Sequence, residues 1–325
     1  MGESPKEVKK KEFLQDLLER FGIALVALLM FVIFSVLSSK FCSSGNIFNV
    51  FKQISIIAIL SIGMTFVFMI GGMDLSAGSN VMLGAVVTAA LLQSGKASIV
   101  PAMCIALILC MIMGMLNGML IEVLKINCVI VTLGSQLAIR GLALVIIKRY
   151  NSWIWMKDPL LKFVNTGTVL GIPFLFLLVL ILYLGAWVAF HRTAYGRQVY
   201  AVGGNEKTAR LCGINTVRVK VICYVISGLT AGLAGIVAAA RLGMVSTTVG
   251  IGMEFEAVTA VVLGGASLKG GEGNVLKTLI GAVIVGMIAN FMTLFGVDAN
   301  YQSAVTGAFI LFAAIFNRMT QRDVA

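Results

Sequence analysis

The chain has 325 residues, of which 59% are hydrophobic and only 12% are charged, and its formal net charge is +11. A soluble domain carries about 25% charged residues and needs a polar coat around its core, so the composition excludes an ordinary soluble fold. Apolar runs of about 18–22 residues recur along the chain, and this length crosses the hydrocarbon core of a bilayer as a helix. The sequence therefore predicts an all-α polytopic membrane protein.

About ten apolar segments are expected as transmembrane helices. They are 21–38, 52–70, 76–93, 98–121, 126–147, 171–190, 217–240, 255–268, 275–296 and 302–317. The third and the eighth are short and Gly-rich, and an interrupted helix at membrane depth needs protein or water around its backbone, so both are expected inside the bundle. The predicted organisation is an amphipathic segment over 1–20, one transmembrane domain over 21–318 and a tail over 319–325.

The positive charges predict the orientation of these segments. With the N-terminus inside and ten spans, most of the 25 Lys and Arg residues fall on the inner side, as the positive-inside rule requires. The net charge is then explained by topology, and no nucleic-acid-binding pattern accompanies it. The six cysteines form no C-x-x-C motif, and the single histidine, His191, lies beside Arg192 at a predicted membrane boundary. The sequence predicts no metal site, no cofactor and no catalytic residues.

One polar stretch interrupts the apolar pattern between the sixth and seventh spans. It reads "YAVGGNEKTARLCGIN" over 200–215. A phosphate-binding loop is excluded because Glu206 stands where that motif needs a glycine before its lysine. Asn205 as N-cap, Glu206 in the first turn, Arg210 four residues later and Gly213 as C-cap predict a helix of about seven residues. So short a helix needs a supporting surface, either another protein or its own bundle.

Four stretches together resemble the permease subunit of bacterial ABC sugar importers of the ribose, galactose and arabinose type. They are "GGMDLSAGS" at 71–79, the stretch at 200–215, "SGLTAGLAGIVAAARLG" at 227–243 and "EFEAVTAVVLGGASLKGGEGNVLKTLIGA" at 254–282. The resemblance implies a vitamin B12-type (type II) importer fold with two pseudo-symmetric halves, in a bacterial plasma membrane, with both termini cytoplasmic. It also implies a second permease copy or homologue, an ATPase subunit that binds ATP and Mg²⁺, and an extracytoplasmic binding protein that delivers a sugar-like solute.

The resemblance makes residues 191–216 a cytoplasmic coupling loop that contacts the ATPase. The residues carried over are Gly203, Gly204, Asn205, Glu206, Ala209, Arg210, Gly213 and Ile214. The chain departs from its relatives at Cys212, often a serine, and at Met73, usually an isoleucine. Asp74 and Ser76, in the turn before the third span, are expected either to cap that span or to act in gating.

Polar residues in the fifth span are candidates for the translocation path. Thr132, Gln136 and Arg140 share one helix face, with Ser135 beside it. A charged residue within a span usually faces the bundle interior or a water-filled cavity, but an interhelical hydrogen-bond ladder explains this face almost as well. Further candidates are Asn290, Gln302 and Thr306.

Three questions stay open at this stage. An ion-driven carrier is the alternative function, although no carboxylate falls in the middle of a predicted span. A pentose, a hexose, a signalling furanose or a nucleoside would each fit as the solute. The outer loop 148–171, with Trp153 and Trp155, either anchors at the membrane interface or docks the binding protein through its lysines.

Overall fold

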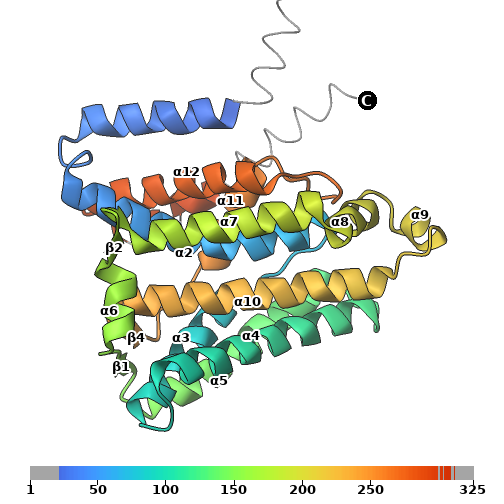
Figure 1. Ribbon diagram of the computed structural model, residues 1–325, viewed down its shortest axis with the longest axis horizontal. Coiled ribbons are helices and arrows are strands. Elements are labelled where there is room, and N and C mark those ends of the chain that lie inside the picture. The colour runs from blue at the N-terminus through green and yellow to red at the C-terminus, as the bar shows by residue number, and fades with distance from the viewer. Residues whose placement is uncertain (1–21, 299–300, 303, 309–310, 312–325) are drawn as a thin grey trace, which may run out of the picture.

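The protein is mostly helical, and its long helices run side by side as one bundle (Figure 1). The computed structural model describes residues 22–298, 301–302, 304–308 and 311. The predicted segments 1–20 and 319–325, and most of the tenth apolar segment, lie outside the described residues.

Six helices among the described residues are long and apolar enough to cross a membrane. They are α2 (Ser44–Met69), α4 (Ile99–Glu122), α5 (Cys128–Lys148), α7 (Phe174–Arg192), α10 (Thr216–Leu242) and α12 (Val275–Leu294). Shorter helices occupy Gly22–Leu37, α3 (Ala77–Gln93) and α11 (Met253–Leu263). A helix therefore lies at each of the first nine predicted segments. The largest difference in a boundary is at α2, which begins at Ser44 rather than at 52. Its N-cap is Ser43, whose side chain accepts a hydrogen bond from the Asn46 amide.

Burial separates central helices from peripheral ones. The most apolar windows of α2 and α10 are 78% and 67% buried, whereas those of α4, α5 and α7 are each 28% buried. The short helices α3 and α11 are also mostly buried, as predicted from their glycine content. Peripheral helices present apolar side chains outward, which is the arrangement a bilayer stabilises.

Glycines allow α4 and α10 to pack backbone to backbone. A Cβ atom added at Gly114 would overlap the carbonyl oxygen of Tyr224, and one added at Gly228 would overlap the carbonyl oxygen of Cys110. Small residues spaced four apart permit such close approach between membrane helices. These glycines therefore serve the close packing of α4 against α10.

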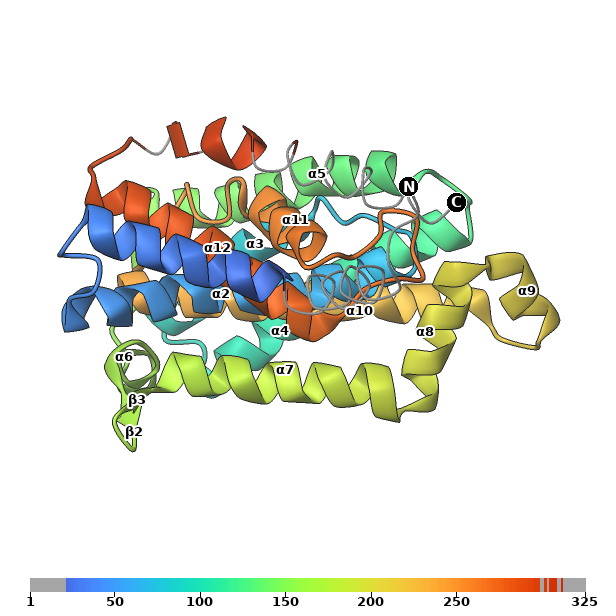
Figure 2. The same cartoon turned by 90° about the horizontal axis from the view of Figure 1, so that it is seen from above.

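The two ends of the bundle carry different connections (Figures 1 and 2). At one end, β1 (Trp153–Trp155) pairs antiparallel with β4 (Met244–Ser246), next to α6 (Pro159–Thr166) and the short strands β2 (Thr168–Val169) and β3 (Ile172–Pro173). At the other end lie α8 (Ala194–Gly204) and α9 (Glu206–Leu211). The all-α expectation missed these short strands, and the predicted loop 148–171 contains ordered structure.

Candidate functional site: the α8–α9 segment

The polar stretch after α7 folds into two short helices. Asn205 caps α9, since its side chain accepts a hydrogen bond of 3.0 Å from the Thr208 amide. The preceding helix α8 was not predicted, although Thr193 caps it in the same way at the Gly196 amide. The predicted short helix is thus present, with six residues instead of about seven.

The C-terminal end of α9 is closed by a Schellman motif. The amide of Ile214 donates to Ala209 over 3.1 Å and the amide of Gly213 donates to Arg210 over 3.0 Å. Cys212 is the C-cap, and Gly213 follows it with a φ of +81°, a conformation in which glycine carries no steric penalty. Gly213 therefore ends the helix as predicted, one position later than the C-cap itself.

A chain of ion pairs ties α9 to the bundle. The Glu206 carboxylate accepts from Lys220 on α10 over 2.6 Å and from Arg210 over 3.1 Å. Lys220 also lies 3.0 Å from Glu122 at the end of α4, and Lys125 pairs with Glu122 over 3.3 Å. The sequence assigned Glu206 to contact with a partner, but its carboxylate is bound within the chain. Lys220 and Glu122 were not predicted as site residues.

The electrostatics of Glu206 follow from these contacts. The hydrogen bond from Lys220 lowers the pKa of the Glu206 carboxyl below its ordinary value. Partial burial acts in the opposite direction, and the neighbouring positive charges lower the pKa further. Glu206 therefore stays ionised under ordinary conditions, and its contact with Lys220 is a charge-assisted hydrogen bond.

Glycines fasten α8 to the bundle at a second place. A Cβ atom at Gly203 would overlap the carbonyl oxygen of Met69, the last residue of α2, and one at Gly271 would lie 2.8 Å from the Cα of Gly204. The Gly271 amide in turn donates to the Met69 carbonyl over 2.9 Å. We call this contact the glycine junction; it comprises Gly71, Gly203, Gly204, Gly270 and Gly271. Gly203 and Gly204, carried over as partner-contact residues, lie at this internal contact.

The face of α9 turned away from the bundle is exposed. Ala209 is buried, whereas Leu211 is 89% exposed. Lys207, Thr208, Arg210 and Cys212 are exposed around it. Leu211 is thus an exposed apolar side chain with polar and charged neighbours on a capped helix.

Asp74 and Ser76 belong to a buried chain of hydrogen bonds that links several helices. Asp74 accepts from the amide and hydroxyl of Ser76, over 3.0 and 2.6 Å, and from the Ser227 hydroxyl on α10 over 2.6 Å. Ser76 accepts in turn from Asn117 on α4, which accepts from Ser135 on α5. Asp74 thus binds the amide of the α3 N-cap and also bridges to α10.

Two other polar residues of α5 contact α11 and the segment that precedes it. Gln136 donates to the Glu254 carboxylate over 2.8 Å, and Arg140 donates to the Thr247 carbonyl over 2.8 Å. Thr132 is buried and bonds its own helix at Cys128. Of these contacts, the Gln136–Glu254 hydrogen bond joins two helices, whereas Arg140 reaches a residue outside a helix and Thr132 bonds within α5. Among the described residues, the second oxygen of Glu254 is buried with no hydrogen-bond partner.

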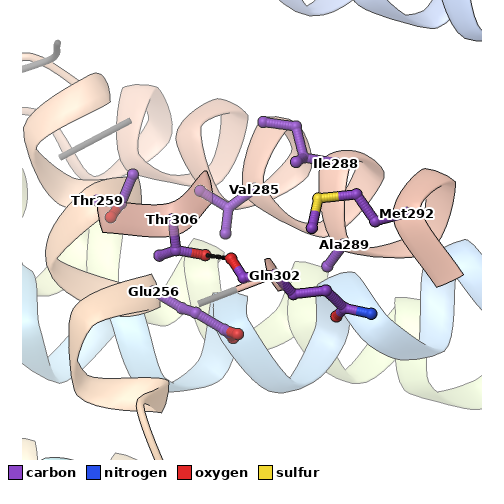
Figure 3. A pocket seen from close by; sticks show the side chains of 8 residues that line it. All are labelled: Glu256, Thr259, Val285, Ile288, Ala289, Met292, Gln302 and Thr306. Carbon is purple, nitrogen blue, oxygen red and sulfur yellow. Dashed lines mark hydrogen bonds between the residues drawn. The ribbon is translucent and has the colours of Figure 1, made fainter. Parts of the chain in front are cut away.

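The remaining path candidates fall into two places. Asn290 exchanges two hydrogen bonds with Asn46, of 3.0 and 3.1 Å, so the pair joins α12 to α2. Gln302 and Thr306 line a small pocket, in which Thr306 donates to the Gln302 carbonyl (Figure 3). The other lining residues are Glu256, Thr259, Val285, Ile288, Ala289 and Met292.

Sequence comparison relates the chain to known transport proteins. Residues 46–314 match the family described as branched-chain amino acid transport system / permease component. The chain is 38% identical over 301 residues to the ribose import permease protein of Escherichia coli (strain K12), covering 92% of this chain and 94% of that protein. It is 32% identical over 307 residues to the D-allose transport system permease protein of the same strain, covering 94% and 93%. A probable ABC transporter permease protein of that strain is 34% identical over 319 residues, covering 98% and 95%.

No solved structure matches the chain. The family match covers well over half of the sequence, and all three relatives are aligned along nearly their whole length. The chain therefore belongs to the family of ABC transporter permease components.

Proposed function

We propose that this chain is the membrane-spanning permease subunit of an ATP-driven importer for a sugar or sugar-like solute. The names of the ribose and D-allose relatives support the solute class. The six long apolar helices support the membrane location. In this proposal an extracytoplasmic binding protein delivers the solute, a separate ATPase subunit binds ATP and Mg²⁺, and a second permease completes the path.

The finer architecture is also part of the proposal. We propose about ten spans in a type II importer fold of two pseudo-symmetric halves, in a bacterial plasma membrane, with both termini cytoplasmic. Helices at the first nine predicted segments support this count. The distribution of lysine and arginine supports the orientation, which places α9 in the cytoplasm and β1 outside.

We propose that the ATPase subunit docks on the exposed face of α9. Leu211 stands almost fully in solvent, while Glu206 and Ala209 on the same helix are held by the bundle. An apolar anchor surrounded by polar side chains is the arrangement of an interface hot spot. ATP-driven closure of the ATPase subunits would then move α9 by direct contact. Arg210, already paired with Glu206, adds charge at the edge of this surface.

The test compares two equally exposed leucines at opposite ends of the bundle. Leu211 is 89% exposed on α9 and Leu170 is 98% exposed between β2 and β3. Leu211→Ser should reduce co-purification of the ATPase subunit and ATP-dependent uptake of D-ribose, whereas Leu170→Ser, at the end away from α9, should leave co-purification of the ATPase subunit unchanged. If the Leu211 variant retains the ATPase subunit fully and takes up sugar at the wild-type rate, α9 is not the docking element.

For the path itself, we propose the polar face of α5 with Gln136 and Arg140, together with Gln302 and Thr306 beside α11 and α12. Side-chain amides, hydroxyls and a guanidinium can bind sugar hydroxyls, and each binds weakly enough for release. Ser135, Thr132 and Asn290 bond mainly to other helices or to their own, so we assign them to packing beside the path.

The alternative function, an ion-driven carrier, is favoured by one observation. Glu254 has a buried carboxylate oxygen without a hydrogen-bond partner among the described residues, and such a group can carry a proton. Proteoliposomes separate the two functions. Uptake that needs ATP and the ATPase subunit supports the importer, whereas uptake that needs only an ion gradient and is abolished by an ionophore supports the carrier.

A further inference from the structure

We infer that Lys220 is the positioning residue that fastens the coupling helix α9 to the α4–α10 helix pair, so that movement of α9 is passed to these two helices. The inference rests on the proposed function, because it assumes that α9 receives the motion of an ATPase subunit. It adds two residues, Lys220 and Glu122, that lie outside the predicted coupling loop.

Lys220 joins carboxylates from two different parts of the chain. Its ammonium group lies 2.6 Å from Glu206 on α9 and 3.0 Å from Glu122 at the last turn of α4. Lys220 is 14% exposed and Glu122 is 5% exposed, so solvent screens this contact little. Removing the ammonium would leave Glu206 and Glu122 with only their exposed partners, Arg210 and Lys125, and no side chain would then join α9 to α4.

The helices that receive this contact are packed closely against each other. The glycine contacts at Gly114 and Gly228 bring the α4 and α10 backbones together along their length, and α9 lies beyond the end of this pair (Figure 1). Interfaces packed at this density transmit displacement as rigid units. Displacement of Glu206 is therefore passed to α4 and α10 through the Lys220 side chain.

The α8–α9 segment thus has two attachments that lead to different helices. The glycine junction joins α8 to the end of α2 and to the turn between α11 and α12. Lys220 joins α9 to α4 and α10. Displacement of the segment would act on both groups of helices while both attachments hold, and loss of the second would leave ATP hydrolysis uncoupled from transport.

The experiment uses the assembled transporter in proteoliposomes, with ATPase subunits, binding protein and radiolabelled D-ribose. Lys220→Met keeps the length of the side chain and removes its charge, whereas Lys220→Arg keeps the charge. We expect Lys220→Met to retain the ATPase subunit and to hydrolyse ATP. The number of sugar molecules imported per ATP hydrolysed should fall by at least about fivefold. Lys220→Arg should restore the ratio.

Lys125→Met is the matched control, because Lys125 contacts the same Glu122 but is 60% exposed. An exposed ion pair contributes about 0–1 kcal/mol, so this variant should couple normally. If Lys220→Met fails to fold, Glu122→Gln combined with Lys220→Met also removes the buried carboxylate that has lost its Lys220 partner, and is tested instead. A wild-type ratio of sugar to ATP in a folded variant without Lys220 would overturn the inference. Failure of the wild-type assembly to import any sugar would instead contradict the proposed function.

Discussion

Gly203 packs directly against the main chain of Met69 and Gly271, with no room between them for a side chain. This contact holds α8 against the end of α2, so the α8–α9 segment is part of the bundle and is not a loose loop. Its neighbour Gly204 has open space at the corresponding position. Two consecutive glycines therefore differ in what they can tolerate.

We predict that Gly203→Ala lowers the thermal stability of the purified protein, because the added methyl group must displace main-chain atoms. Overpacking of this kind costs about 1–3 kcal/mol. Gly204→Ala is the control and should be neutral or slightly stabilising. The melting temperature in detergent measures both. Equal melting temperatures for the two variants would mean that the glycine junction yields without cost.

The pH dependence of the α9 attachment follows from Glu206. Because the folded-state pKa of this carboxyl is lowered by Lys220, its contribution to stability is complete above the unfolded value of about 4.3 and is lost as pH falls through the folded value. Protease cleavage within α8–α9 should therefore stay slow from pH 8 to 5 and increase in stronger acid. Glu206→Gln should already be cleaved faster at pH 7, with a flatter pH profile. An unchanged rate for that variant would contradict the prediction.

Much of the fold could be predicted from the sequence, because apolar length alone decides where a helix can lie in a membrane. The capping roles of Asn205 and Gly213 could also be predicted from the sequence, because capping depends on residues within one helical turn. Lys220 and Glu122 could not be found in this way. They are 98 positions apart, and each had a sufficient local explanation as a charge at the end of a span.

The same limit explains the assignments that changed. The resemblance assigned Glu206 and Gly203 to contact with a partner, but within the chain Glu206 contacts Lys220 of α10 and Gly203 contacts Met69 of α2 and Gly271. In the sequence, Asn290 is an isolated polar residue in an apolar helix. In the structure, it is hydrogen-bonded to Asn46 of α2. Contacts between distant segments have no periodic signal in one sequence.

A double-mutant cycle tests the link between α10 and the turn before α3. Asp74 accepts from Ser227, and both side chains are buried. Leaving a buried polar group without its partner costs about 1–3 kcal/mol. We expect Asp74→Ala to destabilise the protein more than Ser227→Ala, because it also releases Ser76.

In this cycle the double variant should be little less stable than Asp74→Ala alone, since the shared contact is already lost. Denaturation in a fixed detergent measures the three variants against the wild type. Fully additive losses would mean that Asp74 and Ser227 contribute to stability independently.

At the opposite end of the bundle, β1 fixes a loop that carries exposed tryptophans and lysines. Pairing with β4 places Trp155 opposite Met244, so the loop has a defined position (Figure 1). Lys157 and Lys162 follow β1 and are both exposed. In the proposed orientation this surface faces the binding protein, and a basic surface attracts an acidic rim over about 10 Å at 0.1 M salt.

Reversal of Lys157 and Lys162 to Glu should therefore slow the ATPase activity that the binding protein stimulates at low salt. The effect should shrink as salt is raised, because screening weakens the attraction of both the wild type and the variant. Basal ATPase activity without the binding protein should stay unchanged, which separates docking from assembly. Trp155→Leu, made in parallel, tests membrane anchoring through yield and insertion. If the reversed variant is stimulated like the wild type at every salt concentration, the lysines do not dock the binding protein, and the loop serves to anchor the protein at the membrane surface.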